Sequence, residues 1–195
     1  PELPLGSARL RGMGETGMQA VELAALDWLQ ANCRTAFLDW LMPAVSALCN
    51  NGEIWIALAA ALLLTKKYRR TGAVVALALL LALLCCHAVL KPLTARPRPC
   101  DVNTAVALLT PRPGDWSFPS GHTAASMAAV GALLAEGSRL WIPALALTVL
   151  IAFSRLYLYL HWPSDVLAGA VLGAALGFAA SCIVRRIERK RGVSR

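Results

Sequence analysis

The chain has 195 residues, which is enough for one domain and too few for two of ordinary size. Hydrophobic residues make up 57% of it and charged residues 15%, a balance that excludes an ordinary soluble domain and indicates lipid as the solvent. The formal net charge is +8, but the basic residues lie between and after apolar runs and form no continuous stripe. We therefore expect no nucleic-acid partner and interpret these cations as topology signals and anion ligands.

The first residues contain no initiator Met and no apolar core of a signal peptide. We expect residues 1–17 to be a cloning remnant or a disordered N-terminus, with Met13 or Met18 as a plausible native start. Residues 18–195 are expected to form a single membrane-embedded domain. At the start of that domain, apolar residues at helical spacing over 18–33 predict either an interfacial helix or an extension of the first span.

Apolar runs separated by charge, proline and glycine predict an all-α, polytopic membrane protein with a bundle of six spans. Several runs are shorter than the roughly 20 residues that cross a bilayer, so their ends must include flanking polar residues or lie inside the protein. The six predicted spans are 35–49, 54–65, 73–90, 122–135, 140–159 and 164–184.

Basic clusters indicate how the spans are oriented. Four cations lie within 66–70, after the second span, and five lie within 185–191, after the last one. Positive residues mark the cytoplasmic side, so both termini are predicted to be cytoplasmic in a cell (plasma or inner) membrane. The loop 91–121 and the turn around His161 then share the extracellular or periplasmic face, which places an active site at the outer membrane interface.

Glycines recur at four-residue steps in the last predicted span, at Gly169, Gly173 and Gly177. Such spacing lets another helix approach the backbone closely. We prefer packing within one bundle to a dimer seam, and the oligomeric state is left open.

The six cysteines have no metal-ligand spacing, and no metal is expected. Cys85, Cys86 and His87 are neighbours on a helix and diverge around its axis, so they do not form a metal site. His87 is expected to be a satisfied residue of the helix interior. Cys49 and Cys100 share the predicted outer side, where a disulfide between them is conceivable.

Three polar clusters interrupt the apolar chain, and the predicted topology places all of them on the outer side. The first holds Lys91 and Arg98. Because Pro92 disfavours helical geometry at the residue before it, we expect the third span to end near Lys91 and Arg98 to sit on a stiff, proline-rich loop.

The second cluster is Pro119-Ser120-Gly121-His122, just before the fourth span. A Ser-Gly turn at a helix start offers free backbone N–H groups and the positive end of the helix dipole to an anion. His122 opens that helix and could protonate a leaving oxygen.

The third cluster holds Ser154, Arg155, His161 and Asp165. A buried Arg155 near membrane depth is costly unless an anion meets it, although a lone arginine there could also be an interfacial anchor. His161 and Asp165 are four residues apart at the start of a helix, a spacing that could place the carboxylate beside the imidazole. One ring nitrogen would then be held, leaving the other as a nucleophile toward phosphorus.

This order of residues resembles the three-part signature of the type 2 phosphatidic acid phosphatase family, membrane lipid phosphatases that include bacterial undecaprenyl-diphosphatases and phosphatidylglycerophosphatase B-like enzymes. The resemblance implies that His161 forms a phosphohistidine, Asp165 orients it and His122 is the general acid, without a metal or other cofactor. It also implies which residues hold the phosphate, namely Lys91, Arg98, Ser120, Gly121 and Arg155.

The predicted function is thus hydrolysis of a lipid phosphate or diphosphate, with a membrane lipid and the bilayer as partners. We favour undecaprenyl diphosphate, with phosphatidylglycerophosphate and phosphatidic acid as alternatives, because Arg96 and Arg112 could provide spare charge for a second phosphate. A different class of function, a non-catalytic lipid-binding or lipid-translocating protein, would need the cations but no nucleophile.

Overall fold

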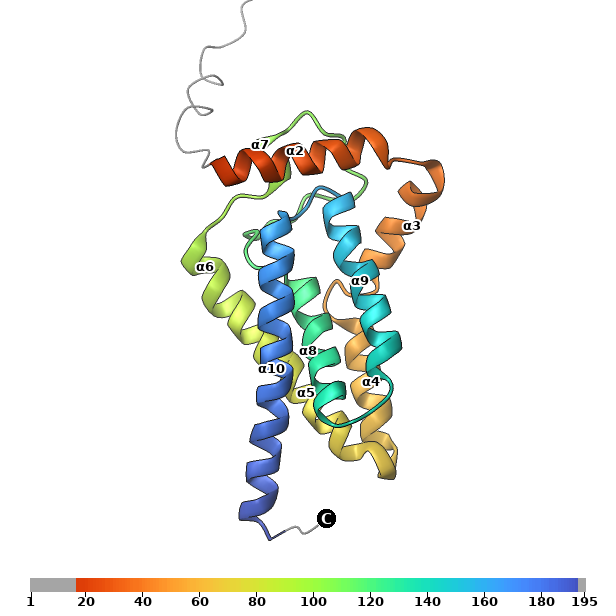
Figure 1. The fold of residues 1–195 in the computed structure, drawn as a ribbon, viewed down its shortest axis with the longest axis vertical. Coiled ribbons are helices and arrows are strands. Elements are labelled where there is room, and N and C mark those ends of the chain that lie inside the picture. The colour runs from red at the N-terminus through yellow and green to blue at the C-terminus, as the bar shows by residue number, and fades with distance from the viewer. Residues whose placement is uncertain (1–16, 193–195) are drawn as a thin grey trace, which may run out of the picture.

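The computed structural model describes residues 17–192, which are helical and contain no β-strand within that range. The prediction of an all-α fold is therefore confirmed. Figure 1 shows an elongated bundle with α2 lying across one end and the C-terminus at the opposite end. The helices in chain order are α2 (Gly17–Asn32), α3 (Ala36–Ala47), α4 (Glu53–Leu64), η1 (Lys66–Tyr68), α5 (Arg69–Leu83), η2 (Leu84–Leu90), α6 (Lys91–Thr94), α7 (Pro99–Val102), α8 (Gly121–Ala135), α9 (Trp141–Tyr157) and α10 (Pro163–Lys190).

Six of these helices, namely α3, α4, α5, α8, α9 and α10, overlap the six predicted spans. By length and composition, the stretch Lys66–Val102, which runs from η1 to α7, and helix α10 are long and apolar enough to cross a membrane. The other four are apolar helices of 12 to 17 residues, so six membrane crossings remain a prediction. Helix α10 continues to Lys190, six residues past the predicted end at 184, because its last turns carry charge but nothing that stops a helix.

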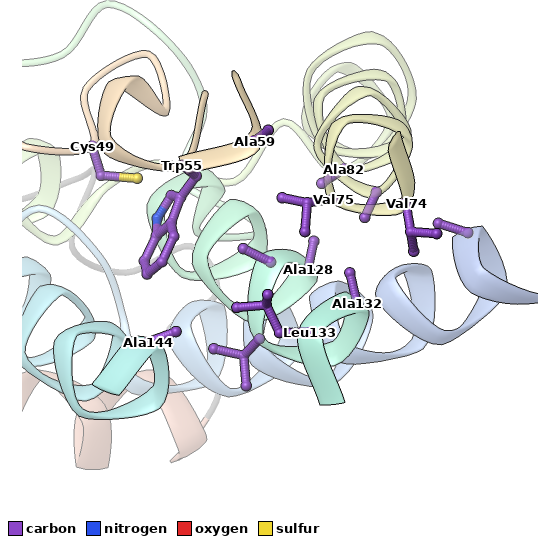
Figure 2. Close-up of a cluster of buried hydrophobic side chains, with 14 of the residues drawn as sticks. Cys49, Trp55, Ala59, Val74, Val75, Ala82, Ala128, Ala132, Leu133 and Ala144 are labelled. Atoms are coloured by element: carbon purple, nitrogen blue, oxygen red, sulfur yellow. The ribbon is translucent and has the colours of Figure 1, made fainter. Parts of the chain in front are cut away.

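Helix α8 lies at the centre of the bundle and packs most extensively on α10. A Cβ atom added at Gly173 would lie 2.2 Å from the carbonyl oxygen of Ala124, and one at Gly177 would lie 2.5 Å from that of Ala128. Only glycine permits this approach, so the glycine spacing serves packing inside the bundle. On another side of α8, Figure 2 shows its small side chains facing Val75 of α5.

The third span, predicted to end near Lys91, continues through that residue and ends at Thr94, after the short helix α6. The π-helical turn η2 precedes it, and the Lys91 amide donates to the carbonyl of Cys86, five residues back. This shifted pairing makes Pro92 an early residue of a new helical segment, where its missing N–H costs nothing.

Helix α2 is separate from α3 and begins at Gly17; the predicted N-terminal remnant otherwise lies outside the described residues. Helix α2 ends at Asn32. Thr35 caps the next helix, because its hydroxyl accepts a hydrogen bond from the Leu38 amide. Of the two alternatives for this segment, an extension of the first span is therefore wrong, and an interfacial position of α2 stays a prediction.

All six cysteines are unpaired in the described part of the chain. The Cys49 thiol lies 3.7 Å from the Ser126 hydroxyl in the main core. Cys100 is buried in a second apolar cluster with Leu26 and Tyr157. The conceivable disulfide between Cys49 and Cys100 is therefore absent.

Candidate active site

A cavity of about 1190 Å³ opens into the end of the bundle where α8 and α10 begin and α9 ends. Its polar part collects residues from all three clusters that the sequence singled out. Six of the eight predicted site residues line it, namely Lys91, Arg98, Gly121, His122, Arg155 and His161.

Three cations line this cavity, and each comes from a different element. Lys91 begins α6, Arg98 precedes α7, and Arg155 belongs to the last turn of α9; each is at most 5% exposed. Arg155 donates to the Ser46 hydroxyl of α3, and its Nε atom finds no acceptor among residues 17–192. Buried cations with spare donors favour an anionic ligand.

His161 lies in the short link between α9 and α10, with Nδ1 3.4 Å from Oδ2 of Asp165. Arg98 Nη1 lies 3.1 Å from the other ring nitrogen, Nε2. Because a guanidinium only donates, Nε2 must be the unprotonated nitrogen and Nδ1 carries the proton toward Asp165. Burial, together with Arg98 and Arg155, also holds the pKa of His161 well below its usual value, so the ring is neutral at pH 7.

Asp165 is fully buried behind His161 and does not line the cavity. Its carboxylate accepts hydrogen bonds from the Trp162 amide at 3.0 Å, from Arg96 Nη1 at 2.6 Å and from the Ser117 hydroxyl. Its backbone carbonyl accepts from the Ser120 amide at 3.0 Å, which joins the start of α8 to the start of α10.

Ser120 differs from the expectation that it contacts phosphate. Its side chain is fully buried, and its hydroxyl caps α8 by accepting from Thr123. With its amide donated to Asp165, Ser120 supports the turn instead of facing the cavity, whereas Gly121 does line it. The glycine leaves the helix N-terminus open toward the cavity.

His122 lies on the cavity wall, where its ring contacts no carboxylate within hydrogen-bonding distance in the described residues. Its Nε2 atom lies 3.3 Å from Asn50 Oδ1 and 3.5 Å from Arg155 Nη1. His87 was expected to be a satisfied interior residue, but it is exposed and lines the same cavity, with Nε2 3.0 Å from where a side chain on Gly121 would begin.

Sequence reasoning missed Asp115, which bridges two of the cations. Its Oδ1 atom accepts from Arg98 Nη2 at 2.6 Å, and its Oδ2 atom accepts from Lys91 Nζ. Burial raises the pKa of Asp115, but the ion pairs with Lys91 and Arg98 outweigh it and hold that pKa well below its usual range. The sequence could have pointed to Asp115, because it is an acidic residue in the same predicted outer loop as Lys91 and Arg98.

Arg96 and Arg112 do not supply the spare charge that was expected of them. Arg96 is paired with both Glu22 and Asp165, and Arg112 is paired with Asp101. Neither arginine lines the cavity. Both carboxylate partners of Arg96 are about 70 positions away in the chain, which the sequence pattern did not reveal.

A metal site was not expected, and residues 17–192 contain no cluster of three or more His, Cys, Asp or Glu side chains placed to hold one. Cys86 is buried and His87 is exposed, and both line the cavity. The described side chains that line the cavity include three cations, three histidines, the Asp115 carboxylate and several neutral polar groups, and Gly121 adds the N-terminus of α8.

The PAP2 superfamily model matches residues 71–189, a segment that contains the polar residues lining this cavity except those within 46–51. The chain belongs to the PAP2 superfamily. The resemblance drawn from the sequence motifs is confirmed.

The chain is also similar to several individual phosphatases. An undecaprenyl-diphosphatase of Sulfolobus acidocaldarius is 36% identical over 64% of this chain, and the match spans 61% of that relative's own length. A lipid A 4'-phosphatase of Bacteroides thetaiotaomicron is 32% identical over 79% of this chain and 73% of its own. The fold matches a transmembrane PAP2-type phosphatidylglycerolphosphate phosphatase from Bacillus subtilis, with a TM-score of 0.72 and 24% identity over 94% of this chain and 92% of that one.

The geometry predicts that Asp115 competes with an anion for Lys91 and Arg98. Asp115→Asn keeps the shape and removes the charge, so inorganic phosphate should bind about three- to tenfold more tightly, or about 0.6–1.4 kcal/mol. Calorimetric titration of the purified protein in detergent measures this. Glu188→Gln, which neutralises an acid outside the cavity at the opposite end of the bundle, should leave phosphate affinity unchanged, and unchanged affinity in Asp115→Asn would contradict the competition.

Proposed function

We propose that this PAP2 protein is a lipid phosphatase that hydrolyses a phosphate or diphosphate of a membrane lipid. The observation that carries the proposal is one continuous cavity with a cationic end and an apolar end. The apolar part runs between α4 and α5, where Ile56 and Leu63 face a wall that includes Leu79 and Leu83. Since a helix rises 1.5 Å per residue, the stretch 56–63 alone offers about 10 Å of apolar wall to a lipid tail.

In the proposed reaction, Nε2 of His161 attacks phosphorus while the bond from phosphorus to the leaving oxygen breaks, and His122 gives that oxygen a proton. Water then attacks the phosphohistidine and loses a proton to His122, which releases inorganic phosphate and restores both histidines. Asp165 holds the Nδ1 proton of His161 throughout. The charge on the equatorial oxygens is stabilised by Lys91, Arg98, Arg155 and the Gly121 amide.

His122 must be protonated to act as the general acid, and the negative charge of the bound substrate favours that protonation. Arg155 Nη1 lies 3.5 Å from its Nε2 atom, and this cation opposes protonation of the ring. A phosphate bound between these groups would neutralise that cation and favour imidazolium. The negative charge of the substrate thus promotes protonation of His122, the general acid.

The mechanism predicts different effects for the three histidines of the chain. His161→Ala should abolish turnover of a lipid phosphate. His122→Ala should lower it by about 10²- to 10⁴-fold but still form phosphohistidine from an aryl phosphate, whose leaving group needs no proton. His87→Ala, at the same cavity, is the control and should remain within about fivefold of wild type, because it takes no part in the proposed proton transfers.

Phosphate release and acid-quenched phosphoenzyme, both measured in excess EDTA, give the readouts. Turnover by His161→Ala at the wild-type rate would remove the proposed nucleophile. Wild-type protein that binds phosphate but releases none from any lipid phosphate would favour the non-catalytic lipid-binding or translocating alternative. A requirement for added divalent metal would contradict the metal-independent reaction.

We also propose that the cationic end of the cavity faces the extracellular or periplasmic side, with six membrane crossings and both termini cytoplasmic. The opposite end of the bundle carries the basic residues of 66–70 and 185–191, which supports this orientation. Arg70 pairs there with Glu136 and Glu188, so not every cation in the count is free, but the others outnumber the acids.

The orientation predicts a labelling pattern for single cysteines in a cysteine-free background. Arg112→Cys should react with a membrane-impermeant maleimide in intact cells, whereas Tyr68→Cys should react only after permeabilisation. Both parent side chains are exposed, so accessibility within the protein is matched. The reverse pattern would place the cavity on the cytoplasmic side.

Undecaprenyl diphosphate, a polyprenyl diphosphate, is our proposed substrate. Cleaving a diphosphate expels a phosphate monoester, which is a better leaving group than the alkoxide released from a glycerolipid. The reaction therefore depends less on proton donation by His122. An outward-facing cavity near the interface would meet such lipids, and the long apolar wall suits an isoprenoid tail. The undecaprenyl-diphosphatase among the relatives supports the same choice.

Substrate preference is measured as kcat/KM for undecaprenyl diphosphate, phosphatidylglycerophosphate, phosphatidic acid and lipid A in one detergent. We expect the diphosphate to be preferred by about tenfold or more, which is about 1.4 kcal/mol in transition-state binding. An equal preference for a glycerolipid phosphate or for lipid A would overturn the substrate assignment and leave the phosphatase reaction standing.

A further inference from the structure

Helix α2 is attached directly to the segment that carries the nucleophile. Figure 1 shows α2 lying across the end of the bundle, over the link between α9 and α10. Gln30 donates to the carbonyl of Tyr157 at 2.7 Å, and Asp27 accepts from the Tyr159 hydroxyl at 2.5 Å. Tyr159 has φ of +60°, a strained backbone for a residue with a side chain, so this link needs outside contacts to hold its shape.

The contact nearest the chemistry is made by Glu22 of α2. One of its oxygens accepts from the Ser164 amide at 2.6 Å, at the first turn of α10. The other accepts from Arg96 Nη2, also at 2.6 Å. Glu22 is buried even though it belongs to a surface helix, and a carboxylate is buried only where a cation and donors meet it.

Arg96 passes this contact on to the pair behind the nucleophile. Its Nη1 atom donates to Oδ1 of Asp165 at 2.6 Å and to the Ser164 hydroxyl at 2.7 Å. Its guanidinium also lies 5.1 Å from the centre of the Trp162 ring. The planar fork of Arg96 therefore has one arm on Glu22 and the other on Asp165, a geometry that lysine cannot reproduce.

This arrangement divides the two oxygens of Asp165 between separate tasks. Oδ1 is held by Arg96, whereas Oδ2 faces His161 Nδ1 and accepts from Trp162 and Ser117. If Arg96 moved, the carboxylate could rotate, and the proton on His161 would lose its fixed partner. The effect would fall on the orientation and tautomer of the imidazole and not on the phosphate-binding cations.

We propose that Glu22 and Arg96 are positioning residues for the reaction, which makes the N-terminal helix α2 part of the catalytic apparatus. The inference rests on the proposed phosphatase function. Glu22 fixes Arg96, Arg96 fixes Asp165, and Asp165 fixes His161. Neither Glu22 nor Arg96 touches the substrate, because neither lines the cavity.

The test compares charge-removing and geometry-removing variants with a matched control. Glu22→Gln keeps the size of the side chain and its acceptor for Ser164, and Arg96→Lys keeps the charge but loses the fork. Each should lower kcat by about ten- to a hundredfold while KM and the inhibition constant for inorganic phosphate stay within about twofold. Arg112→Lys, the same change in the other arginine outside the motifs, should leave kcat unchanged.

A double-mutant cycle separates positioning from general structural support. If Glu22 acts through Arg96, adding Glu22→Gln to Arg96→Lys should lower kcat no further. Multiplying losses would overturn the relay, as would a fall in kcat accompanied by equal losses in phosphate affinity and melting temperature. In ¹⁵N-histidine spectra, the variants should also show His161 losing its single Nδ1–H tautomer, and an unchanged signal would overturn the proposed route.

Failure of this inference is distinguishable from failure of the proposed function. Wild-type protein without turnover of any lipid phosphate would remove the function on which the relay rests. Wild-type turnover, with Asp165→Asn slow and both Glu22→Gln and Arg96→Lys at the wild-type rate, would leave the phosphatase intact and remove only the role of α2.

Discussion

Three cations are buried at one end of an apolar bundle, and the rest of the site depends on how their charge is compensated. Lys91, Arg98 and Arg155 each lose water, and the cavity must return hydrogen bonds and negative charge to them. The protein's own compensation is incomplete, because Asp115 is the one carboxylate among the residues described as lining the cavity. A phosphate can complete it. Burial lowers the pKa of His161, and the same three cations lower it further, so that the cluster that binds an anion also helps to keep the nucleophile neutral.

Such a cluster needs a rigid frame, which the close contact of α8 and α10 provides. Gly173 lets the two backbones touch, and the Ser120 amide binds the Asp165 carbonyl where both helices begin. The second and third motifs are thereby joined by main-chain contacts, which move less than side chains. The apolar wall of α4 and α5 continues from this frame, so that a lipid phosphate can be held by its headgroup and its tail together.

Much about this protein is determined by local sequence. Apolar runs of limited length predicted the helices, because hydrophobic periodicity and helix breakers act over a few residues. The cationic, Ser-Gly-His and His-Asp motifs predicted which part of the surface would be polar. His161 and Asp165 illustrate the reach of this reasoning, since four residues at a helix start place the two side chains near each other whatever the rest of the chain does.

Tertiary structure decided which groups remain free and which are engaged. The sequence predicted Arg96 to be a spare cation. In the structure it bridges Asp165 and Glu22, which α2 brings to it from 74 positions away. Asp115 and Lys91 meet across 24 positions, and Ser120 lost its free amide to Asp165. Ion pairs and hydrogen bonds depend on distances of about 3 Å between groups that only the packed bundle brings together, and a motif records the residue types without those distances. For this reason the sequence alone determined the chemistry available to the protein, and the fold determined how its charges are divided between binding, positioning and catalysis.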